Sequence, residues 1–527
     1  MTPLCTLQLV FGQSKAAEKV EFHFEDVTIP VSIKELADWS KGIDTNDAFG
    51  KKTNERNDSE LSVWLNMLGF QSRSALANFL NAPLVRDKSM FHQLLRSWAG
   101  RKLLDKVSDS ISLDDDKTGT KLFNSLEFLL EQQEEVSTLE LLNYLPAEVI
   151  HFDLNKWFLI VSSWRDELRQ QQKLLSDLKR LTIQSGITAD NKIVFTELKE
   201  SINEVFLLDV EHREQPLKLE IWNPLSRKIT RRSWIVFMPG LGGDPHHFRW
   251  LARSLSHKGW PVVIINHPGS DSEALNLLLD GREPVPGGAE VFTYRLSDLN
   301  AVLQAKNNGA LNISGTNVIL MGHSLGALTS FLASGANPQD GLSERCEKAL
   351  DDLSITNLSR LLQCQLVEVP LPEQKKIENL EAIVGINSFG GLLWPYDFNV
   401  QTKTPVLLTG GTYDLITPLL SEQLGVLTSL QPNKFSRVLI IEGASHFSPI
   451  RVKGQTDQSK GQDIFQLSDT LIGSHPLSVQ SLLAHEIIRF LDNLESGNQV
   501  NIISNKINSD LRYYILDQST AKQLIGN

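Results

Sequence analysis

The chain has 527 residues, of which 41% are hydrophobic and 22% charged, and its formal net charge at pH 7 is −12. This composition is typical of a globular protein and excludes an intrinsically disordered chain. Nucleic-acid-binding proteins need a basic surface, so the acidic balance disfavours nucleic acid as a partner. A chain of this length is too long for one ordinary hydrophobic core, and it predicts two domains.

Targeting and redox signals leave the compartment open. No run of about 18 apolar residues is present, so a transmembrane helix is not expected. The first residues, up to Phe11, are mildly apolar but lack a preceding Lys or Arg and are interrupted by polar residues. The protein is expected in the cytoplasm by default, or exported if this N-terminus is a truncated signal peptide. The cysteines indicate neither a disulfide framework nor a metal site; they are Cys5, Cys346 and Cys364.

Residues 1–200 are expected to form a mostly helical domain. Val20, Phe22 and Phe24 alternate with polar residues and predict one half-buried strand. After a polar loop, apolar residues recur at helical spacing in several stretches, whose tryptophans are interpreted as core residues. These stretches are Leu61/Trp64/Leu65/Leu68, Phe91/Leu94/Leu95/Trp98, Leu122/Leu126/Leu129/Leu130 and Trp157/Val161/Trp164/Leu168.

From about residue 201 the pattern changes to short apolar runs separated by helical stretches. This alternation predicts an α/β fold with a mainly parallel sheet covered by helices on both faces. An amphipathic helix is expected at Pro476–Leu494, and no element is assigned to residues 499–527. The expected strands are Val205–Val210, Leu217–Trp222, Trp234–Met238, Val262–Asn266, Asn317–Met321, Ala382–Ile386, Val406–Leu408 and Val438–Ile441.

Two long gaps interrupt this alternation, at Ser270–Glu290 and Asn337–Asn379. Connections this long are uncommon in a compact domain unless they carry a function. Both leave the sheet at the edge where open α/β sheets bind their ligands. We therefore expect them to form lids or binding loops over a site at that edge.

The strongest functional signal is Gly322-His323-Ser324-Leu325-Gly326, directly after an expected strand. A Gly-x-Ser-x-Gly turn between a strand and a helix holds its serine hydroxyl above the edge of the sheet, in a strained backbone. Gly322 and Gly326 are needed because the chain passes close to the turn on both sides of Ser324. The flanking strand and helix are the context that a chance match to this short pattern lacks.

Partners for this serine occur later in the chain. A serine hydroxyl needs a base to take its proton, and an acid must orient the base; with this turn the chain order is Ser, acid, His. Asp414 and His446 follow in that order, each directly after an expected strand. The expected catalytic residues are therefore Ser324, Asp414 and His446. Glu442 and Asp397 remain alternatives for the acid.

An acyl-transfer site also needs backbone N–H groups fixed toward the developing oxyanion. One is expected from Leu325, the residue after the serine. The other is expected from Leu241, in the loop Pro239-Gly240-Leu241-Gly242-Gly243 directly after a strand. Gly240 is expected to have a structural role in this loop.

The histidines near these motifs are interpreted as structural. His323 lies within the turn, and its side chain is expected to pack beneath it. His246 and His247 are adjacent and cannot easily share one ion, and no third ligand is patterned around them. We therefore expect no metal and no organic cofactor.

Several of these pieces also occur together in one known family. They are Pro239–Gly243, Asn266-His267-Pro268-Gly269-Ser270, Gly322–Gly326, Asp414 and His446. On them, residues 234–450 resemble an α/β-hydrolase of the branch that holds platelet-activating-factor acetylhydrolases and dienelactone-hydrolase-like proteins. The resemblance implies a serine esterase, lipase-like, that cleaves lipid or short-chain acyl esters through an acyl-enzyme.

Two positions depart from that branch. Pro239 stands where the branch commonly has a histidine. The oxyanion contact is a backbone N–H one residue further on, so we expect this change to be tolerated. Ser324 stands where true dienelactone hydrolases have a cysteine, which speaks against that particular reaction.

The N-terminal part resembles a helical domain of unknown function that precedes such hydrolases in a group of bacterial proteins, commonly behind an export signal. The order of helices and the stretches Leu139–Leu145 and Asp153–Trp157 carry this resemblance, which implies no activity. The expected organisation is residues 1–200 as this domain, 201–498 as the catalytic domain and 499–527 as a C-terminal tail.

Other functions remain open. The same triad could transfer an acyl group to an alcohol or a thiol, or cleave a thioester. The hydrolase domain could also be an inactive scaffold in a binding module whose work is done by the helical domain. The sequence does not indicate the oligomeric state.

Overall fold

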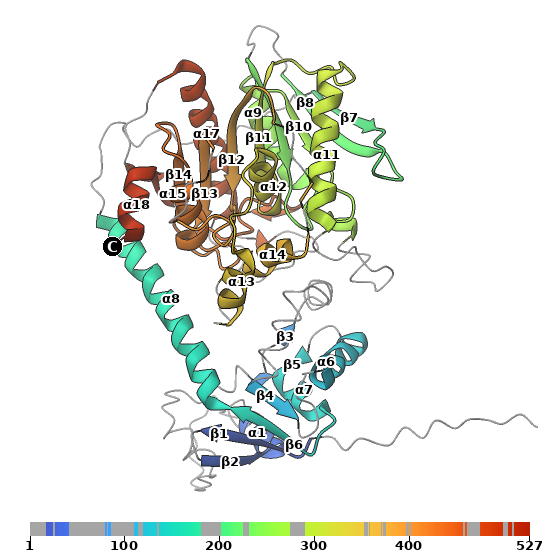
Figure 1. Cartoon of the computed structure of the whole chain (residues 1–527), viewed down its shortest axis with the longest axis vertical. Coiled ribbons are helices and arrows are strands. Elements are labelled where there is room, and N and C mark those ends of the chain that lie inside the picture. Colours follow the sequence, from blue (N-terminus) through green and yellow to red (C-terminus); the bar gives the residue numbers. More distant parts are fainter. Residues whose placement is uncertain are drawn as a thin grey trace, which may run out of the picture. The chain divides into compact units, whose positions relative to one another are not determined.

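Figure 1 shows the computed structural model of the chain, which divides into two compact units. The smaller unit comprises Met1–Arg96 and Gly100–Ser162, and the larger comprises Ser97–Ala99 and Ser163–Asn527. The structure describes residues 17–24, 27–41, 80–81, 83–85, 110–113, 120–133, 136–180, 202–224, 231–274, 290–351, 357, 359–369, 371–372, 376–396, 400, 402–456, 459–460, 475–498, 504–508 and 511–526.

The smaller unit is built on a four-stranded sheet in the order β2-β1-β6-β4. β1 pairs antiparallel with β2 and parallel with β6, which lies far along the chain. Side chains alternate across a sheet, so Val20 and Ile150 are buried in the core, whereas Glu21 and His151 face the opposite side. The strands are β1 Lys19–Phe24, β2 Val27–Ser32, β4 Ile111–Leu113 and β6 Val149–Asp153.

Helices supply the rest of this core. Apolar residues of α1 (Ile33–Lys41), α6 (Thr120–Gln132) and α7 (Thr138–Tyr144) join those of the sheet in one cluster. The sequence predicted one strand in this region and the sheet has four, because strands as short as β4 and β6 show too few alternations to stand out. A small two-stranded sheet pairs β3 (Pro83–Val85) with β5 (Val136–Ser137).

Two of the helical stretches expected from the sequence, Leu61–Leu68 and Phe91–Trp98, lie outside the described residues. The long helix expected from about Asn155 is α8, Leu154–Arg180. Its backbone is described throughout, but the side chains of Trp157 and Trp164 are not among those described.

The larger unit contains a ten-stranded sheet in the order β17-β18-β14-β13-β12-β11-β9-β10-β8-β7. Its centre, from β14 to β10, is parallel throughout, and antiparallel strands flank it on both sides. The mainly parallel sheet expected from the sequence is confirmed. The strands are β7 Ile202–Leu208, β8 Leu217–Asn223, β9 Ser233–Met238, β10 Val262–Ile265, β11 Asn317–His323, β12 Leu380–Ile386, β13 Val406–Gly411, β14 Arg437–Ile441, β17 Ser504–Asn508 and β18 Leu511–Asp517.

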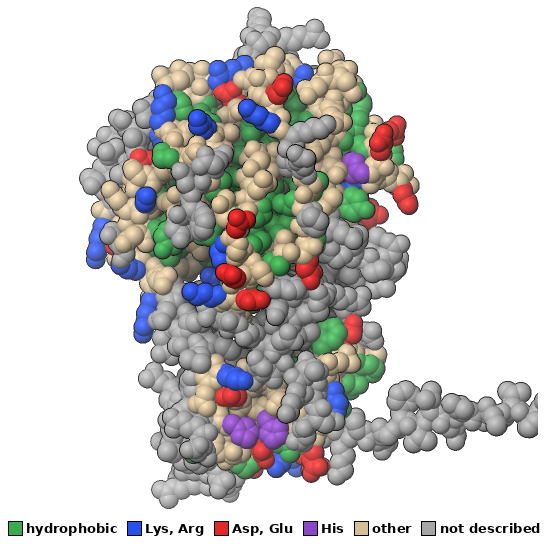
Figure 2. Space-filling view, viewed as in Figure 1, with side chains coloured by type: hydrophobic (Ala, Val, Ile, Leu, Met, Phe, Trp, Pro, Cys, Tyr) green, Lys and Arg blue, Asp and Glu red, His purple; other side chains and the backbone are tan. Residues whose placement is uncertain are grey.

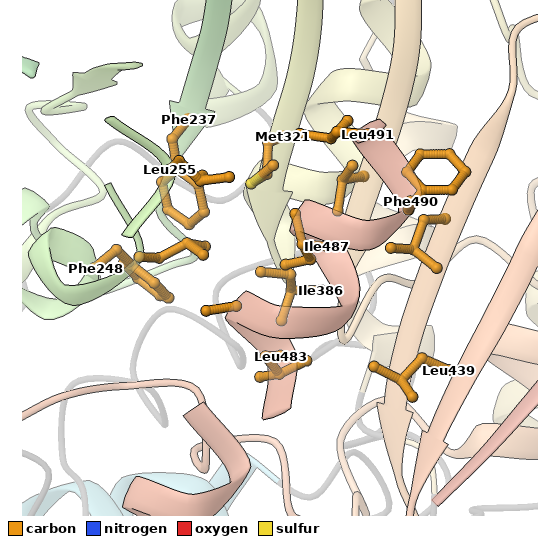
Figure 3. Packing of buried hydrophobic residues seen from close by; sticks show 14 of the residues in the cluster. Phe237, Phe248, Leu255, Met321, Ile386, Leu439, Leu483, Ile487, Phe490 and Leu491 are labelled. Carbon is orange, nitrogen blue, oxygen red and sulfur yellow. The ribbon is translucent and has the colours of Figure 1, made fainter. Parts of the chain in front are cut away.

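Helices cover both faces of this sheet, which is why its central strands are almost continuously apolar. On one face lie α9 (Arg249–His257) and α17 (Pro476–Ser496), which fits the amphipathic helix expected from Pro476. On the other lie α11 (Glu290–Asn307) and α12 (Leu325–Ala333) (Figure 1). Figure 3 shows the packing of α17, in which Leu483, Ile487 and Leu491 lie in one cluster with the strand residues Met321, Ile386 and Leu439.

The C-terminal segment, to which the sequence assigns no element, adds strands to the sheet. β18 pairs antiparallel with β14, β17 pairs with β18, and α18 (Gln518–Gly526) follows. Among the described residues, no helix has both the length and the apolar character needed to cross a membrane.

The second long connection folds into α13 (Leu342–Asp351), α14 (Ser359–Cys364) and a short 3-10 turn. A disulfide joins Cys346 in α13 to Cys364 in α14, and these two helices are adjacent in the chain. The sequence predicted no such pairing, because neither the number nor the spacing of the cysteines indicates one. Most of the first long connection, residues 275–289, lies outside the described residues.

A buried carboxylate holds this second connection in place. Glu422, 1% exposed, accepts hydrogen bonds from the side-chain amides of Asn357 at 2.6 Å and Gln363 at 3.3 Å. It also accepts from the backbone N–H groups of Gly390 and Gly391, each at 2.8 Å. One side chain therefore ties the connection to the loop that follows β12.

We expect the disulfide to stabilise the larger unit by closing a loop in its unfolded chain. Replacing Cys346 and Cys364 together by Ser should lower the free energy of unfolding by at most about 3 kcal/mol, as for a loop of this length. Chemical denaturation followed by tryptophan fluorescence measures the change, and Cys5→Ser serves as the control. Two results would contradict this account. One is a double variant with the denaturation midpoint of the wild type, and the other is a reductant that lowers the midpoint of the double variant as much as that of the wild type.

Candidate active site

Ser324 occupies a sharp turn between β11 and α12. Its backbone has φ 52° and ψ −117°, a region that non-glycine residues rarely adopt. A Cβ on Gly322 would lie 2.2 Å from the backbone carbon of Gly326, and a Cβ on Gly326 would lie 1.9 Å from the Met238 carbonyl oxygen. The sequence-based reason for both glycines therefore holds: the chain leaves no space for a side chain on either side of the serine.

Asp414 and His446 meet at the carboxyl ends of β13 and β14. Because these strands are parallel neighbours, the residues that follow them emerge at the same edge of the sheet. His446 Nδ1 lies 3.0 Å from Asp414 Oδ2, and both side chains are buried. A carboxylate oxygen only accepts, so in the neutral ring Nδ1 carries the proton and Nε2 is the basic nitrogen.

Other groups converge on the Asp414 carboxylate. The Asn387 amide donates to Oδ2 at 2.7 Å and the Thr417 hydroxyl donates to it at 2.6 Å. The backbone N–H groups of Ile416 and Thr417 donate to Oδ1 at 2.9 and 2.8 Å. Burial alone would raise the pKa of Asp414, but the charge of His446 and the hydrogen bonds of His446 and Thr417 hold this pKa below its ordinary value.

His323 lies beside His446 rather than only beneath the turn. Its Nε2 donates to the His446 carbonyl oxygen at 3.0 Å, and the two rings are 4.9 Å apart. Burial, followed by the charge of His446, lowers the pKa of His323 to about 3, so this ring is neutral at ordinary pH. The contact links the chain around Ser324 to the segment that carries His446.

The structure thus brings Asp414 and His446 into direct contact and places Ser324 on the turn next to them. Among the described residues, no hydrogen bond joins the Ser324 hydroxyl to the His446 ring in this geometry. Such bonds are often long in unliganded active sites and shorten when substrate binds.

The glycine-rich loop after β9 lies against the serine. A Cβ on Gly240 would be 3.1 Å from Ser324 Cβ and 2.9 Å from His323 Nδ1, so this glycine is required by close approach. Within the described part of the chain, the N–H groups of Leu241 and Leu325 donate to no other group. They are available to a ligand.

Arg295, which the sequence did not single out, holds this loop from behind. Its buried guanidinium donates to the carbonyl oxygens of Pro239 at 2.7 Å and Gly240 at 2.9 Å, and to the Ser270 hydroxyl at 3.0 Å. The Gly240 carbonyl and the Leu241 N–H belong to one planar peptide group and point in opposite directions. By fixing the carbonyl, Arg295 fixes the direction of the N–H.

The charge of Arg295 is balanced by a buried acid. Burial lowers the pKa of Arg295 to about 9, and the negative charges of Asp298 and Asp271 act against this effect. Asp298 accepts from His267 at 2.8 Å and from Arg213 at 2.6 and 2.7 Å. Burial would raise the pKa of Asp298, yet these hydrogen bonds hold it at about 2.

The remaining candidates from the sequence lie elsewhere. The Glu442 carboxylate accepts from the Tyr514 hydroxyl, and Asp397 is outside the described residues. His247 is buried and its Nδ1 accepts from the backbone N–H of Asp244 at 2.9 Å, while His246 Nδ1 lies 3.3 Å from the Asp244 carboxylate. The adjacent histidines therefore have structural partners.

Comparisons with known proteins agree with this geometry. A family model described as "alpha/beta hydrolase fold" matches residues 233–349, which run from β9 through the serine turn into α13. The larger unit has the α/β-hydrolase fold. The α/β-hydrolase fold expected from the sequence is confirmed, and this fold is generally hydrolytic. A second model, described as "Alpha/beta hydrolase of unknown function (DUF1400)", matches residues 16–153. A comparison with curated proteins found no match.

The α/β-hydrolase turn should not tolerate even one added methyl group at Gly326. Gly326→Ala should abolish soluble folded protein or lower its melting temperature strongly, because the new Cβ would overlap a backbone oxygen that cannot move alone. Gly425→Ala is the matched control, since its Cβ would meet its nearest neighbour, Leu420 O, at an ordinary 3.5 Å. Equal melting temperatures for the two variants would refute the close-approach argument.

Proposed function

We propose that the protein is a serine hydrolase that cleaves carboxylic acyl esters through an acyl-enzyme. In this proposal Ser324 is the nucleophile, His446 the general base and Asp414 the residue that orients the base. The observation that carries it is the buried Asp414–His446 pair, 3.0 Å apart, at the sheet edge where a strained turn presents Ser324. A carboxylate–imidazole pair beside a serine on a strand-to-helix turn is the arrangement that activates a hydroxyl.

The proposed reaction has two halves. His446 Nε2 takes the proton of the Ser324 hydroxyl as Oγ attacks the ester carbonyl carbon. The carbonyl oxygen becomes an oxyanion, which the N–H groups of Leu241 and Leu325 stabilise. The imidazolium then gives its proton to the leaving alcohol, and the acyl-enzyme remains. A water molecule, deprotonated by the same nitrogen, attacks the acyl carbon. The bond from this carbon to Ser324 Oγ then breaks, the imidazolium returns its proton to Oγ, and the acid is released.

Asp414 is suited to its proposed role by its surroundings. Its lowered pKa keeps the carboxylate ionised at neutral pH. Its donors, Asn387 and Thr417, fix its position, so the His446 ring is held in one orientation. Asp414 therefore stabilises the imidazolium of His446 that forms in each half-reaction.

Two features support an acyl ester as the substrate. The motifs of the chain resemble those of platelet-activating-factor acetylhydrolases and dienelactone-hydrolase-like proteins, and Ser324 in place of cysteine favours the esterase chemistry of that branch. The second long connection is anchored by Glu422 to the loop after β12, directly beyond the strand that neighbours the serine turn. We propose that this connection shapes the acyl site, where each buried methylene contributes about 0.8 kcal/mol.

For the chain as a whole, we propose that residues 201–498 carry the catalysis and that residues 1–200 form a separate domain without a part in the chemistry. The β17–β18 pair follows residue 498 in the chain, but it belongs to the same sheet as the strands of residues 201–498.

The proposal predicts that a fluorophosphonate probe labels Ser324 and no other residue. Ser324→Ala should abolish labelling and lower kcat on p-nitrophenyl esters by on the order of a thousandfold or more, as should His446→Ala. Asp414→Asn should be severe but less complete. Ser334→Ala, at the far end of α12, is the matched control and should keep full activity. Ser324→Ala retaining more than about a hundredth of the activity would refute the assignment.

A second prediction concerns Arg295. Arg295→Met should lower kcat by about a hundredfold with little change in KM, because an oxyanion donor acts chiefly in the transition state. Arg295→Lys should recover only part of the loss, since an ammonium group cannot reproduce a planar three-way donor. Arg253→Met, on the exposed side of α9, is the control. A rise in KM with unchanged kcat would instead assign Arg295 to substrate binding.

A further inference from the structure

Three ligand-type side chains gather on one face of the N-terminal sheet, in the smaller unit. Glu21 and His23 are two residues apart on β1 and therefore point to the same side. His151, on the parallel neighbour β6, is the direct partner of Glu21 in the register. Figure 2 shows histidine side chains side by side at the surface over this sheet.

The distances between these groups suit a metal ion. His23 Nε2 lies 3.0 Å from His151 Nδ1, and His151 Nδ1 lies 3.5 Å from Glu21 Oε2. One ligand atom from each of the three residues lies within 4.8 Å of the others. A tetrahedral zinc site, with ligands about 2.0–2.1 Å from the metal, has neighbouring ligand atoms about 3.3 Å apart.

In His23 and Glu21, the atoms that face away from this cluster have partners of their own. His23 Nδ1 lies 3.1 Å from the Thr28 hydroxyl on β2, and the Lys19 ammonium donates to Glu21 Oε1 at 2.8 Å. A histidine ligand usually holds its second ring nitrogen in such a hydrogen bond, which sets the tautomer and turns the other nitrogen toward the metal.

We propose that Glu21, His23 and His151 form a binding site for a divalent transition metal, with zinc as the best fit. Two imidazoles and one carboxylate favour zinc, nickel or copper over magnesium or calcium, which prefer oxygen ligands. The side chains of His151 and Glu21 are 30% and 20% exposed, so an ion can enter from solvent and a fourth position faces water. A hydrogen bond between His23 and His151 would by itself explain why these two rings touch. It would not explain why the Glu21 carboxylate lies beside them.

A bound ion would connect β1 to β6, two strands that are adjacent in space but far apart in the chain. A metal ion that binds only the folded state raises the free energy of unfolding. Above Kd, this increase grows with the logarithm of the ratio of the free metal concentration to Kd. The site belongs to the smaller unit, so it is independent of the chemistry proposed at Ser324.

Calorimetric titration of Zn²⁺ into the full chain, without a histidine tag and after treatment with EDTA, tests the site. The expected result is one ion per chain and a higher melting temperature. His23→Ala and His151→Ala should each weaken binding by about a hundredfold or more, and Thr28→Val by about tenfold to a hundredfold. His257→Ala, which removes an exposed histidine of α9, should bind zinc as the wild type does. Mg²⁺ should give no heat.

Glu21→Gln keeps the shape of the side chain, so a loss of zinc binding in this variant does not come from misfolding. Circular dichroism checks that the variant is folded. Glu21→Gln should also weaken zinc binding and change the visible spectrum of the Co²⁺-loaded protein. The proposal is overturned if the wild type binds no zinc, or if a His23→Ala/His151→Ala variant that retains its fold binds zinc as tightly as the wild type.

Discussion

The larger unit depends on one contact between two backbones. Where β11 turns into α12, Gly326 lies so close to the end of β9 that the Met238 carbonyl oxygen occupies the place of any side chain. This contact sets the distance between the serine turn and the loop after β9. The positive φ of Ser324 and the tight fit of Gly240 beside it follow from the same approach. A strained residue persists here because the neighbouring strands over-determine its position.

Buried polar side chains anchor the loops at the carboxyl edge of the sheet, in addition to apolar packing by residues such as Phe389 and Trp394. Arg295 satisfies two backbone carbonyls of the loop after β9, and Glu422 satisfies two backbone N–H groups of the loop after β12. A buried loop has many polar groups to pair, and one ionised side chain with several donors or acceptors can pair several of them. Such anchors contribute little net stability once desolvation is counted, but they fix geometry well.

Most of the larger unit could be predicted from the sequence because its signals are local. Apolar runs mark the parallel strands, and the glycines around Ser324 mark a turn whose crowding the structure shows directly. Chain order, together with a position directly after an expected strand, pointed to Asp414 and His446; the structure brings these residues together, and their catalytic roles are a proposal. Arg295 was missed because an arginine in a helix usually faces solvent. Contacts between distant segments were missed because no local pattern encodes them; these are Asn357–Glu422, the β14–β18 pair and the cluster of Glu21, His23 and His151. The Cys346–Cys364 disulfide joins neighbouring helices, but the number and spacing of the cysteines do not indicate it.

The β14–β18 pair has a consequence for the synthesis of the protein. β14 leads directly to His446, and one of its two edges is covered by residues Leu511–Asp517. While the ribosome is still making the stretch between them, that edge of β14 has no partner and presents a row of open backbone groups. The smaller unit can fold early, as N-terminal domains do, whereas the larger unit completes its sheet only after its late strands emerge. During that interval the open edge of β14 can pair with a strand of another chain.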